Sequence, residues 1–353
     1  MNDSLAIILP SLKIGGGNRV LLQFIDLANR DNRNCKLFYL DRKGSKFLTP
    51  NVESIAQSVI GDNLFSILLA SLFLSIRVRF DQSVKTIIIS DPILTIFSFI
   101  YSRKKIVRFV QSNDLDLFNK NIKAGGFVNY IYKIIFKFTQ KCHYHAVLFN
   151  SRYSLESYNK TLQTNKNFSQ SCIVNPSVFT LNFKKKNINS SLKPINISIV
   201  TSSQPRKGLS QFINIIKQSK LKNIKYFVIS QDKLNLPNKN IVLKSPKSDS
   251  EYVQILQKCH FALSTSTFEG FGLPLIESMA LGVVPIAIYN KGMDEYNVNQ
   301  NITIIKSPED FDVQITNIIT SNDKYIKLSK EAIKTASVFT EQKFYSSIIE
   351  KIY

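Results

Sequence analysis

Two glutamates and two glycines with the chemistry to bind a ligand lie close together in residues 266–286, STFEGFGLPLIESMALGVVPI. Glu269 and Glu277 are separated by seven residues, and Gly270 and Gly272 lie between a short apolar run and a helical pattern. Backbone N–H groups and the positive end of the dipole make a helix start a good phosphate site. A carboxylate can accept two hydrogen bonds from the vicinal hydroxyls of a ribose. The spacing therefore predicts a pocket for a nucleotide and a sugar, with Glu277 in the first helical turn and Glu269 just before it.

A second group of candidate residues is cationic. Arg206 and Lys207 precede Gly208 between a strand-like run and a helical pattern, in the segment SSQPRKGLSQFI. The guanidinium presents a fork of donors and the ammonium a compact charge, and both suit the oxygens of a diphosphate. This segment therefore predicts a diphosphate clamp at the start of a helix.

Three successive glycines, Gly15, Gly16 and Gly17, follow the first strand-like run and precede a helical pattern. Because they lack side chains, their backbone can approach a ligand closely. The G-x-G-x-x-G spacing of dinucleotide sites is absent here. A ligand-binding loop and a plain connection both remain open for this segment when it is taken alone.

The elements that must position these residues follow from the pattern of the whole chain. Short β-branched runs alternate with helical patterns throughout, which predicts parallel βαβ units and an α/β fold. A charged and polar stretch at residues 184–194 predicts a linker between two Rossmann-like domains, residues 1–183 and 195–337. The helical pattern of residues 338–353 predicts a C-terminal helix that either caps the second domain or crosses back to the first.

Composition limits the class of protein. The 353 residues exceed one comfortable core, and 44% of them are hydrophobic, as in ordinary globular proteins. A net charge of +21 favours an anionic partner, namely nucleic acid, a membrane or a phosphorylated small molecule, although lysines that merely solvate the surface would give the same value. Four scattered cysteines without metal-ligand spacing argue against a disulfide framework or a zinc site and indicate a reducing compartment.

Two features bear on membranes. The strongest apolar run, residues 64–76, is shorter than the roughly 20 residues that span a bilayer, and the start of the chain lacks the basic region of a secretory signal. Residues 125–141 interleave aromatic residues and isoleucine with lysines at helical spacing. Such a helix can lie on an anionic membrane, or it can be a core helix whose lysines extend to solvent, and the pattern allows both.

The string EGFGLPLIESMALGVVP resembles the E-x7-E motif of the retaining glycosyltransferases of family 4. These enzymes have the GT-B fold, in which two Rossmann-like domains face one another across a cleft. The resemblance implies that Glu277 holds the ribose of a sugar nucleotide and that Glu269 contacts the donor sugar. It also implies that four successive residues place their backbone near the sugar and the diphosphate: Gly270, Phe271, Gly272 and Leu273.

Other segments extend the resemblance over most of the chain. Arg206 and Lys207 match the diphosphate-binding positions of the family. With Glu269, they are the residues that the resemblance implies for catalysis. Thr201 stands where many members carry another arginine, so Arg206 has to supply the second cation.

Gly16 and Gly17 match a glycine loop in the acceptor domain of the family. One departure is Gln111, which stands where many members place a histidine near the reacting sugar. A glutamine cannot exchange a proton at neutral pH, so a histidine-based step is not expected. Asp114 and Asp116 imitate the D-x-D metal motif of another glycosyltransferase fold. Because GT-B members generally need no metal, we expect neither a metal nor another cofactor.

The resemblance implies a retaining, hexosyltransferase-type enzyme that moves a sugar from a nucleoside diphosphate sugar to a glycan or lipid-linked acceptor. It further implies bacterial surface polysaccharide synthesis, of capsule or lipopolysaccharide, in the cytoplasm or at the inner face of the cytoplasmic membrane. The alternatives are a Rossmann-type NAD(P)-dependent oxidoreductase and a basic nucleic-acid-binding protein. The first needs a glycine fingerprint and an acidic residue that the chain lacks, and the second needs a recognition module that is not evident.

Overall fold

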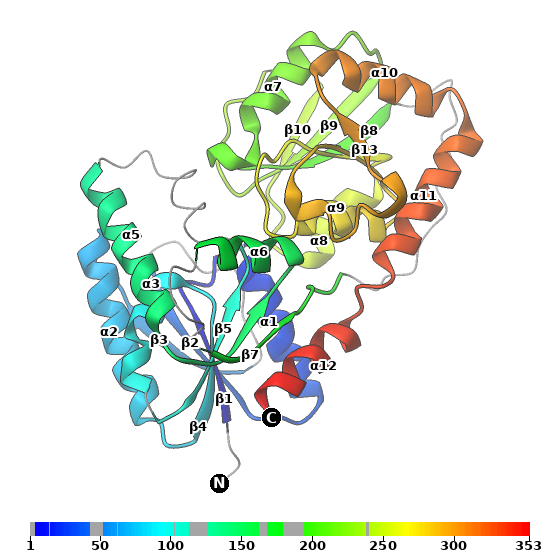
Figure 1. The fold of residues 1–353 in the computed structure, drawn as a ribbon. Coiled ribbons are helices and arrows are strands. Elements are labelled where there is room, and N and C mark those ends of the chain that lie inside the picture. Colours follow the sequence, from blue (N-terminus) through cyan, green and yellow to red (C-terminus); the bar gives the residue numbers. More distant parts are fainter. Residues whose placement is uncertain are drawn as a thin grey trace. The chain divides into compact units, whose positions relative to one another are not determined.

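The computed structural model describes residues 4–13, 15–42, 52–61, 63–101, 103–112, 126–161, 168–178, 194–237 and 240–353. The chain divides into two compact units (Figure 1). Unit 1 comprises Met1–Ser177 and Glu341–Tyr353, and unit 2 comprises Val178–Thr340. The linker predicted over residues 184–194 lies outside the described residues apart from its last one. The predicted α/β fold, with two parallel-sheet domains and C-terminal helices, is confirmed.

The described residues of unit 1 form a seven-stranded parallel sheet in the order β3-β2-β1-β4-β5-β6-β7. Its strands are β1 (Ser4–Leu9), β2 (Cys35–Asp41), β3 (Glu53–Ser58), β4 (Val84–Ile89), β5 (Lys105–Val110), β6 (Tyr144–Phe149) and β7 (Phe168–Ile173). Every residue of β1 is buried. A central parallel strand is covered on both faces, which explains why β1 is a nearly continuous apolar run.

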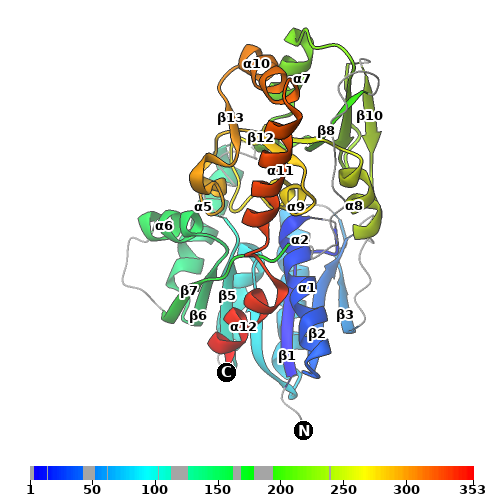
Figure 2. The same cartoon turned by 90° about the vertical axis from the view of Figure 1, so that its right-hand side faces the viewer.

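Helices cover both faces of this sheet (Figure 2). They are α1 (Gly16–Arg30), α2 (Leu64–Phe80), α3 (Pro92–Thr95), the 3-10 helix η1 (Ile96–Tyr101), α5 (Gly126–Lys141), α6 (Arg152–Thr161) and α12 (Glu341–Ile352). The strand order reverses direction at β1, which pairs with both β2 and β4. The carboxyl ends of strands at such a reversal are the usual ligand-binding edge of this kind of sheet. The glycines that follow β1 therefore lie at that edge.

One strand of unit 1, β3, was not predicted from the sequence. Its residues, ESIAQS, are exposed or half-buried, since β3 lies at the edge of the sheet and pairs only with β2 among the described strands. An edge strand with one partner does not need the apolar run that marks a buried strand.

The described residues of unit 2 form a six-stranded parallel sheet in the order β10-β9-β8-β11-β12-β13. Its strands are β8 (Ile195–Val200), β9 (Ile224–Ile229), β10 (Ile241–Lys244), β11 (Phe261–Ser264), β12 (Val284–Ile288) and β13 (Thr303–Ile305). Its helices are α7 (Leu209–Gln218), α8 (Asp249–Gln257), α9 (Leu273–Ala280), α10 (Pro308–Ile319) and α11 (Asn322–Ala336), with short 3-10 helices η2 (Pro205–Lys207), η3 (Lys291–Met293) and η4 (Val298–Gln300). The strand order reverses at β8, so the segments that follow β8 and β11 begin side by side.

The last helix, α12, belongs to unit 1 and packs on α1 (Figure 1). The ring of Phe24 in α1 lies 6.4 Å from the ring of Phe344 and 5.7 Å from the ring of Tyr345. The Tyr345 hydroxyl donates to Asp31, and Arg30 pairs with Glu341 at 3.2 Å. Burial, followed by the bond to Asp31, raises the pKa of Tyr345 to about 12. The chain thus returns to its first domain through an aromatic contact surrounded by polar ones.

We expect Phe344→Ala to destabilise unit 1 by about 3–5 kcal/mol, because it opens a cavity beside the buried ring of Phe24. Urea denaturation followed by circular dichroism measures the change. Gln342→Ala, an exposed substitution in the same helix, is the matched control and should change stability by less than about 0.5 kcal/mol. Equal effects of the two substitutions would show that α12 contributes no packing energy to unit 1.

Candidate functional site

The two charged segments of unit 2 meet at the carboxyl edge of its sheet. Arg206 and Lys207 form η2, which follows β8 and precedes α7. Glu269 lies between β11 and α9. Because β8 and β11 are neighbours in the sheet, the segments that leave them are brought together. The structure thus joins the three residues that the sequence analysis implied for catalysis.

These three residues form an ion-pair cluster. Lys207 Nζ lies 2.6 Å from Glu269 Oε1, and Arg206 Nη1 lies 3.5 Å from Glu269 Oε2. The exposed fractions of the side chains are 17% for Lys207, 19% for Arg206 and 13% for Glu269. One carboxylate against two cations leaves an excess of positive charge, so the cluster can accept an anion without losing its own ion pair.

The electrostatic surroundings keep Glu269 ionised. Burial by itself raises the pKa of this carboxyl group. The charges of Lys207 and Arg206, with hydrogen bonds from Lys207 and Ser266, outweigh burial and hold the pKa below its ordinary value of 4.5. Glu269 is therefore a hydrogen-bond acceptor at neutral pH rather than a proton donor.

Hydrogen bonds from three threonines hold the backbone of the cationic segment. Thr201 Oγ1 donates to the Lys207 carbonyl at 3.1 Å, and the Thr267 amide donates to the Arg206 carbonyl at 2.9 Å. Thr265 Oγ1 also reaches the Lys207 carbonyl, at 3.5 Å. Thr201 thus fastens the segment that carries the two cations.

Gly208 allows the segment to lie this close to β11. Its φ is +65°, a left-handed conformation, and a Cβ placed on it would lie 1.8 Å from the Thr265 carbonyl oxygen. No side chain fits in that space, which explains why a glycine follows Arg206 and Lys207.

The loop that carries Glu269 is fixed by residues that the sequence analysis did not single out. A Cβ on Gly292 would lie 2.4 Å from the Glu269 carbonyl oxygen, so η3 packs directly against this loop. Asn290 Nδ2 donates to the Ser266 carbonyl at 3.0 Å, and the Tyr296 hydroxyl donates to the Gly272 carbonyl at 3.1 Å. In the sequence, these supporting residues are marked by the turn-like triplet Asn-Lys-Gly at residues 290–292.

The turn before α9 combines a left-handed glycine with aromatic packing. Gly272 is the N-cap of α9 with φ +86°, and Pro274 lies in the first turn. Phe271 is buried against Tyr296 and Phe339, with ring centroids 5.5 and 5.4 Å apart. Leu273 also packs against this core. Their side chains therefore belong to the core, whereas the prediction concerned only the backbone of this turn, in which Gly270 is buried and Gly272 is half-buried.

Glu277 is the fifth residue of α9, so placing it in the first turn was wrong by one position. The reason is that Gly272, with its left-handed backbone, delays the helix start to Leu273. Glu277 is 3% exposed. The Glu277 side chain is therefore almost entirely closed to solvent, and its Oε2 is buried.

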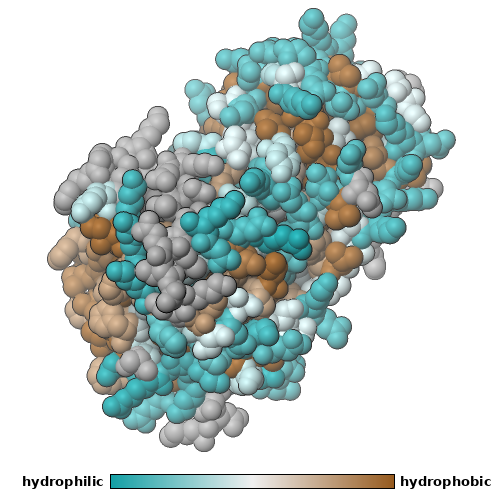
Figure 3. Space-filling view, in the orientation of Figure 1, coloured by the Kyte–Doolittle hydropathy of each residue, from teal (hydrophilic) through white to brown (hydrophobic). Residues whose placement is uncertain are grey.

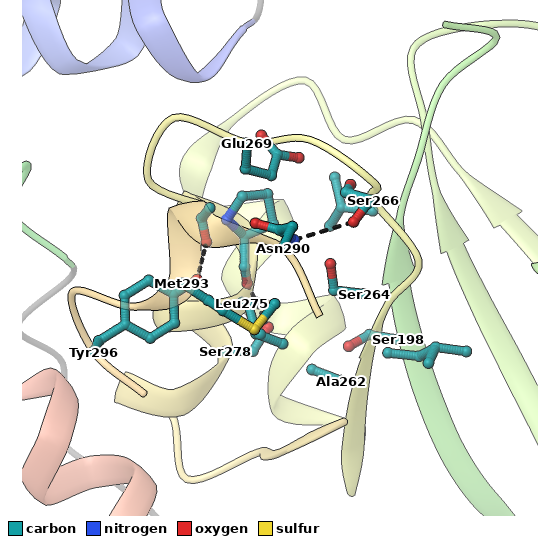
Figure 4. Close-up of a pocket in the computed structure, with 14 residues that line it drawn as sticks. Ser198, Ala262, Ser264, Ser266, Glu269, Leu275, Ser278, Asn290, Met293 and Tyr296 are labelled. Carbon is teal, nitrogen blue, oxygen red and sulfur yellow. Dashed lines mark hydrogen bonds between the residues drawn. The ribbon is translucent and has the colours of Figure 1, made fainter. Parts of the chain in front are cut away.

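A small pocket lies beneath Glu269 (Figure 4). It is lined by hydroxyl groups of Ser198, Ser264, Ser266 and Ser278, and by other residues that do not include Glu277. Its volume is about 20 Å³, which holds about one water molecule. The pocket is therefore too small for a sugar, which would have to lie on the exposed side of Glu269.

The glycine segment of unit 1 is also a helix start. Gly15 is the N-cap of α1, and Gly16 and Gly17 are its first residues. Gln111 Nε2, after β5, donates to the Gly17 carbonyl at 3.0 Å, and a Cβ on Gly17 would lie 2.9 Å from Gln111 Oε1. Asn150 Nδ2 in turn donates to the Gln111 carbonyl at 2.6 Å. In this structure Gln111 thus positions the glycine segment.

The three histidines of the chain and the two aspartates of the D-x-D segment lie elsewhere. His260 Nδ1 accepts the Asn196 amide at 3.0 Å and its ring packs on Tyr325, so this histidine is structural. His143 and His145 line a cavity in unit 1. Asp114 and Asp116 lie outside the described residues. Among the residues that are described, no group of three His, Cys, Asp or Glu side chains could hold a metal ion.

Comparison with known proteins finds a family match within unit 2. Residues 180–335 match the model of the family described as "Glycosyl transferases group 1". A curated relative is the GDP-Man:Man(3)GlcNAc(2)-PP-Dol alpha-1,2-mannosyltransferase of Dictyostelium discoideum, 26% identical over 107 residues, which are 30% of this chain and 21% of that protein. The match thus spans about a fifth of the relative.

Three solved structures share the fold over 99% of this chain. Sucrose-phosphate synthase from Thermosynechococcus elongatus has a TM-score of 0.78 at 12% identity, with 98% of that chain covered. WaaG, a glycosyltransferase involved in lipopolysaccharide biosynthesis, has a TM-score of 0.75 at 14% identity. Anabaena Alr3699/HepE in complex with UDP-glucose has a TM-score of 0.73 at 14% identity, and 99% of each of these two chains is covered.

At these identities the likeness shows the fold, which is the GT-B fold of two parallel-sheet domains. Residues 180–335, the segment that matches the group 1 glycosyltransferase model, include the whole ion-pair cluster.

The lowered pKa of Glu269 predicts a pH-dependent stability difference between the wild-type protein and Glu269→Gln. A carboxyl group with a depressed pKa stabilises the fold above its ordinary pKa of 4.5, and this stabilisation is lost as the pH falls through the depressed value. At pH 7 we expect Glu269→Gln to be less stable by about 1.5–3 kcal/mol, the range for a hydrogen bond to a charged group. Urea denaturation at a series of pH values should show this difference shrinking below pH 4.5. A difference that does not change with pH would contradict the ionised pair.

Gly208→Ala should destabilise unit 2, because the new Cβ would collide with the Thr265 carbonyl in an already unfavourable left-handed conformation. The comparison is Gly15→Ala, also at a helix N-cap, where φ is −162° and the nearest atom to a Cβ is 4.0 Å away. We expect thermal unfolding to show a loss of several degrees for the first variant and little change for the second. Similar melting temperatures would mean that β11 and η2 are not held in this close contact.

Proposed function

We propose that this protein is a retaining glycosyltransferase that moves a sugar from a nucleoside diphosphate sugar to a hydroxyl of a glycan or lipid-linked acceptor. The observation that carries the proposal is the cluster of Arg206, Lys207 and Glu269 at the carboxyl ends of β8 and β11. It lies within the segment that matches a glycosyltransferase family, and an excess of positive charge at a helix start suits a diphosphate.

Arg206 and Lys207 have the role of binding the diphosphate and stabilising the negative charge that develops as it leaves. The N–H groups at the start of α9 add to this stabilisation, since they point away from the helix body. In the free protein Glu269 holds Lys207 in place. When the donor binds, the ammonium can share its three donors between Glu269 and a phosphate oxygen. We propose that these two cations, without a metal or other cofactor, neutralise the leaving group.

Glu269 accepts hydrogen bonds from hydroxyls of the donor sugar in this proposal, as an ionised carboxylate can. We assign the ribose hydroxyls to Glu277, as the resemblance to family 4 implies. Because Glu277 is 3% exposed, the ribose has to approach the edge of the carboxylate at the start of α9. In the sequence, Gly270 and Gly272 lie between the two glutamates.

The chemical step then needs no histidine. The acceptor oxygen forms a bond to the anomeric carbon from the face that the diphosphate leaves, and the bond from that carbon to the phosphate oxygen breaks. The acceptor proton passes to an oxygen of the leaving diphosphate, so atoms and charges balance. Positioning and electrostatic stabilisation supply the rate. Gly16 and Gly17, positioned by Gln111, are assigned to the acceptor side.

We place the reaction in the synthesis of a bacterial surface polysaccharide, a capsule or lipopolysaccharide, in the cytoplasm or at the inner face of the cytoplasmic membrane. The support is the likeness of fold to WaaG, which is involved in lipopolysaccharide biosynthesis. The structure with UDP-glucose bound to Anabaena Alr3699/HepE supports a sugar nucleotide as donor. The match of residues 180–335 to a glycosyltransferase family does not favour the oxidoreductase alternative.

The test is incubation of the full chain with UDP-, GDP- and dTDP-sugars, with release of the nucleoside diphosphate as the readout. We expect one donor to be turned over, and Lys207→Ala to reduce that turnover by on the order of 10²-fold, as for the loss of one preorganised charge. Lys217→Ala, an exposed lysine at the other end of α7, is the matched control and should be unchanged. A failure of every donor to bind or react, with NAD(P)H or an oligonucleotide raising the melting temperature instead, would overturn the proposal.

A further inference from the structure

Unit 1 contains an open cavity of about 730 Å³ that the proposed reaction does not use. It lies at the amino ends of β5 and β6, where Arg103, Lys104 and Lys105 enter β5 and His143 and His145 flank the start of β6. Gln111, which positions the glycine segment, lies at the opposite end of β5, about 20 Å away along the strand. The cavity is therefore a separate site on the other edge of the same sheet.

The lining of this cavity is positively charged. It includes Lys141 as well as Arg103, Lys104 and Lys105, and none of the described residues that line it is acidic. Lys104 Nζ donates to the carbonyls of Asp81 and Val84 at 2.8 and 2.7 Å, so its ammonium is held by the backbone of two residues that do not line the cavity.

One histidine of the cavity, His145, reports the same positive surroundings. Burial, and then the charges of Lys105 and His143, lower the pKa of His145 below its ordinary value. A site in which one cation disfavours the next is one that an anion would stabilise.

The mouth of the cavity is apolar. Phe99 and Phe138 line it, and they are 62% and 42% exposed. Large aromatic side chains that remain in water beside a cluster of cations are costly unless something covers them.

The apolar mouth continues onto neighbouring helices. η1 carries Phe99 and packs against both α2 and α5. In α2, four exposed side chains extend the surface, and Figure 3 shows apolar residues gathered at the left edge of the molecule, where Figure 1 places this helix. These are Phe65, Leu69, Phe73 and Phe80.

The helix α5 presents apolar and cationic stripes side by side. Tyr130, Ile134 and Phe138 are exposed at intervals of four residues, and exposed lysines follow the same interval at Lys133, Lys137 and Lys141. Because the apolar stripe is exposed, α5 is not simply a core helix whose lysines extend to solvent. The segments of α2, η1 and α5 contain no aspartate or glutamate. This is the pattern of a surface that lies in an anionic membrane interface.

Among the described residues, no helix is long and apolar enough to cross a bilayer. We propose that unit 1 docks on an anionic membrane through the outer face of α2, η1 and α5, with the phosphate of a phospholipid headgroup bound in the cavity between Arg103, Lys105 and Lys141. Phe99, Phe138 and the aromatic residues of α2 enter the outer part of the bilayer. The proposal deepens the membrane location assigned above and rests on it, because a lipid-linked acceptor would be delivered at such a surface.

The test is sedimentation of the full chain with two kinds of vesicle. One contains phosphatidylcholine alone, and the other contains phosphatidylcholine with about 30 mol% phosphatidylglycerol. We expect binding only to the anionic vesicles. Arg103→Gln, Lys105→Gln and Lys141→Gln together should weaken it by about 10²-fold, since each cation near an anionic surface contributes about fivefold. The matched control carries the same charge change on exposed lysines of unit 2, Lys217→Gln, Lys220→Gln and Lys222→Gln, and should bind nearly as the wild type.

Phe99→Ser with Phe138→Ser separates insertion from charge, because it should weaken vesicle binding even at high salt, when surface charges are screened. If the two triple variants lose vesicle binding equally, binding depends only on net charge, and the headgroup site is overturned. If inorganic phosphate at roughly millimolar concentration releases the protein from the anionic vesicles, free phosphate is the ligand of the cavity, and the headgroup site is also overturned. A dimer that Phe73→Ser abolishes would show that a second copy covers this face. Sedimentation needs no sugar donor, so loss of transfer and loss of docking are distinguished.

Discussion

The ion pair between Lys207 and Glu269 is the interaction on which the candidate site of unit 2 depends. Both side chains are largely removed from water, where an unpaired charge would be costly. Each therefore requires the other, and together they hold the helix start and the turn before α9 in one place. Arg206 adds a second cation that the single carboxylate does not neutralise. The same contact thus stabilises the free protein and leaves it receptive to an anion.

That pair can form only because the backbones around it approach closely. Gly208 lies against the Thr265 carbonyl, and Gly292 lies against the Glu269 carbonyl, at distances that exclude a side chain. Behind the turn, Phe271, Tyr296 and Phe339 form an aromatic cluster that fixes the loop from the inside. The charged groups are therefore carried on a rigid support, and little of their orientation has to be organised when a ligand arrives.

Unit 1 separates two kinds of surface on one sheet. At the carboxyl edge, Gln111 holds the glycines of α1 through a hydrogen bond to Gly17. At the amino edge, cations and exposed aromatic residues surround a cavity that is open to solvent. A parallel sheet naturally offers this division, because the loops that follow its strands and the loops that precede them lie on opposite edges. Attachment to a surface at one edge would leave the other edge free for chemistry.

The sequence by itself determined the α/β class, most of the buried strands and the residues that begin each helix of the site, since these depend on local apolar period and on glycine and proline. It did not reveal β3, because an edge strand needs no apolar run. It placed the backbone of Phe271 near the ligand and left its side chain open, which the structure packs into the core. Only the tertiary structure decided that Lys207 pairs with Glu269, 62 residues away, and that one face of α2 stays exposed. The physical reason is that ion pairing and burial depend on which elements are neighbours, and here that neighbour relation is set by β8 lying beside β11.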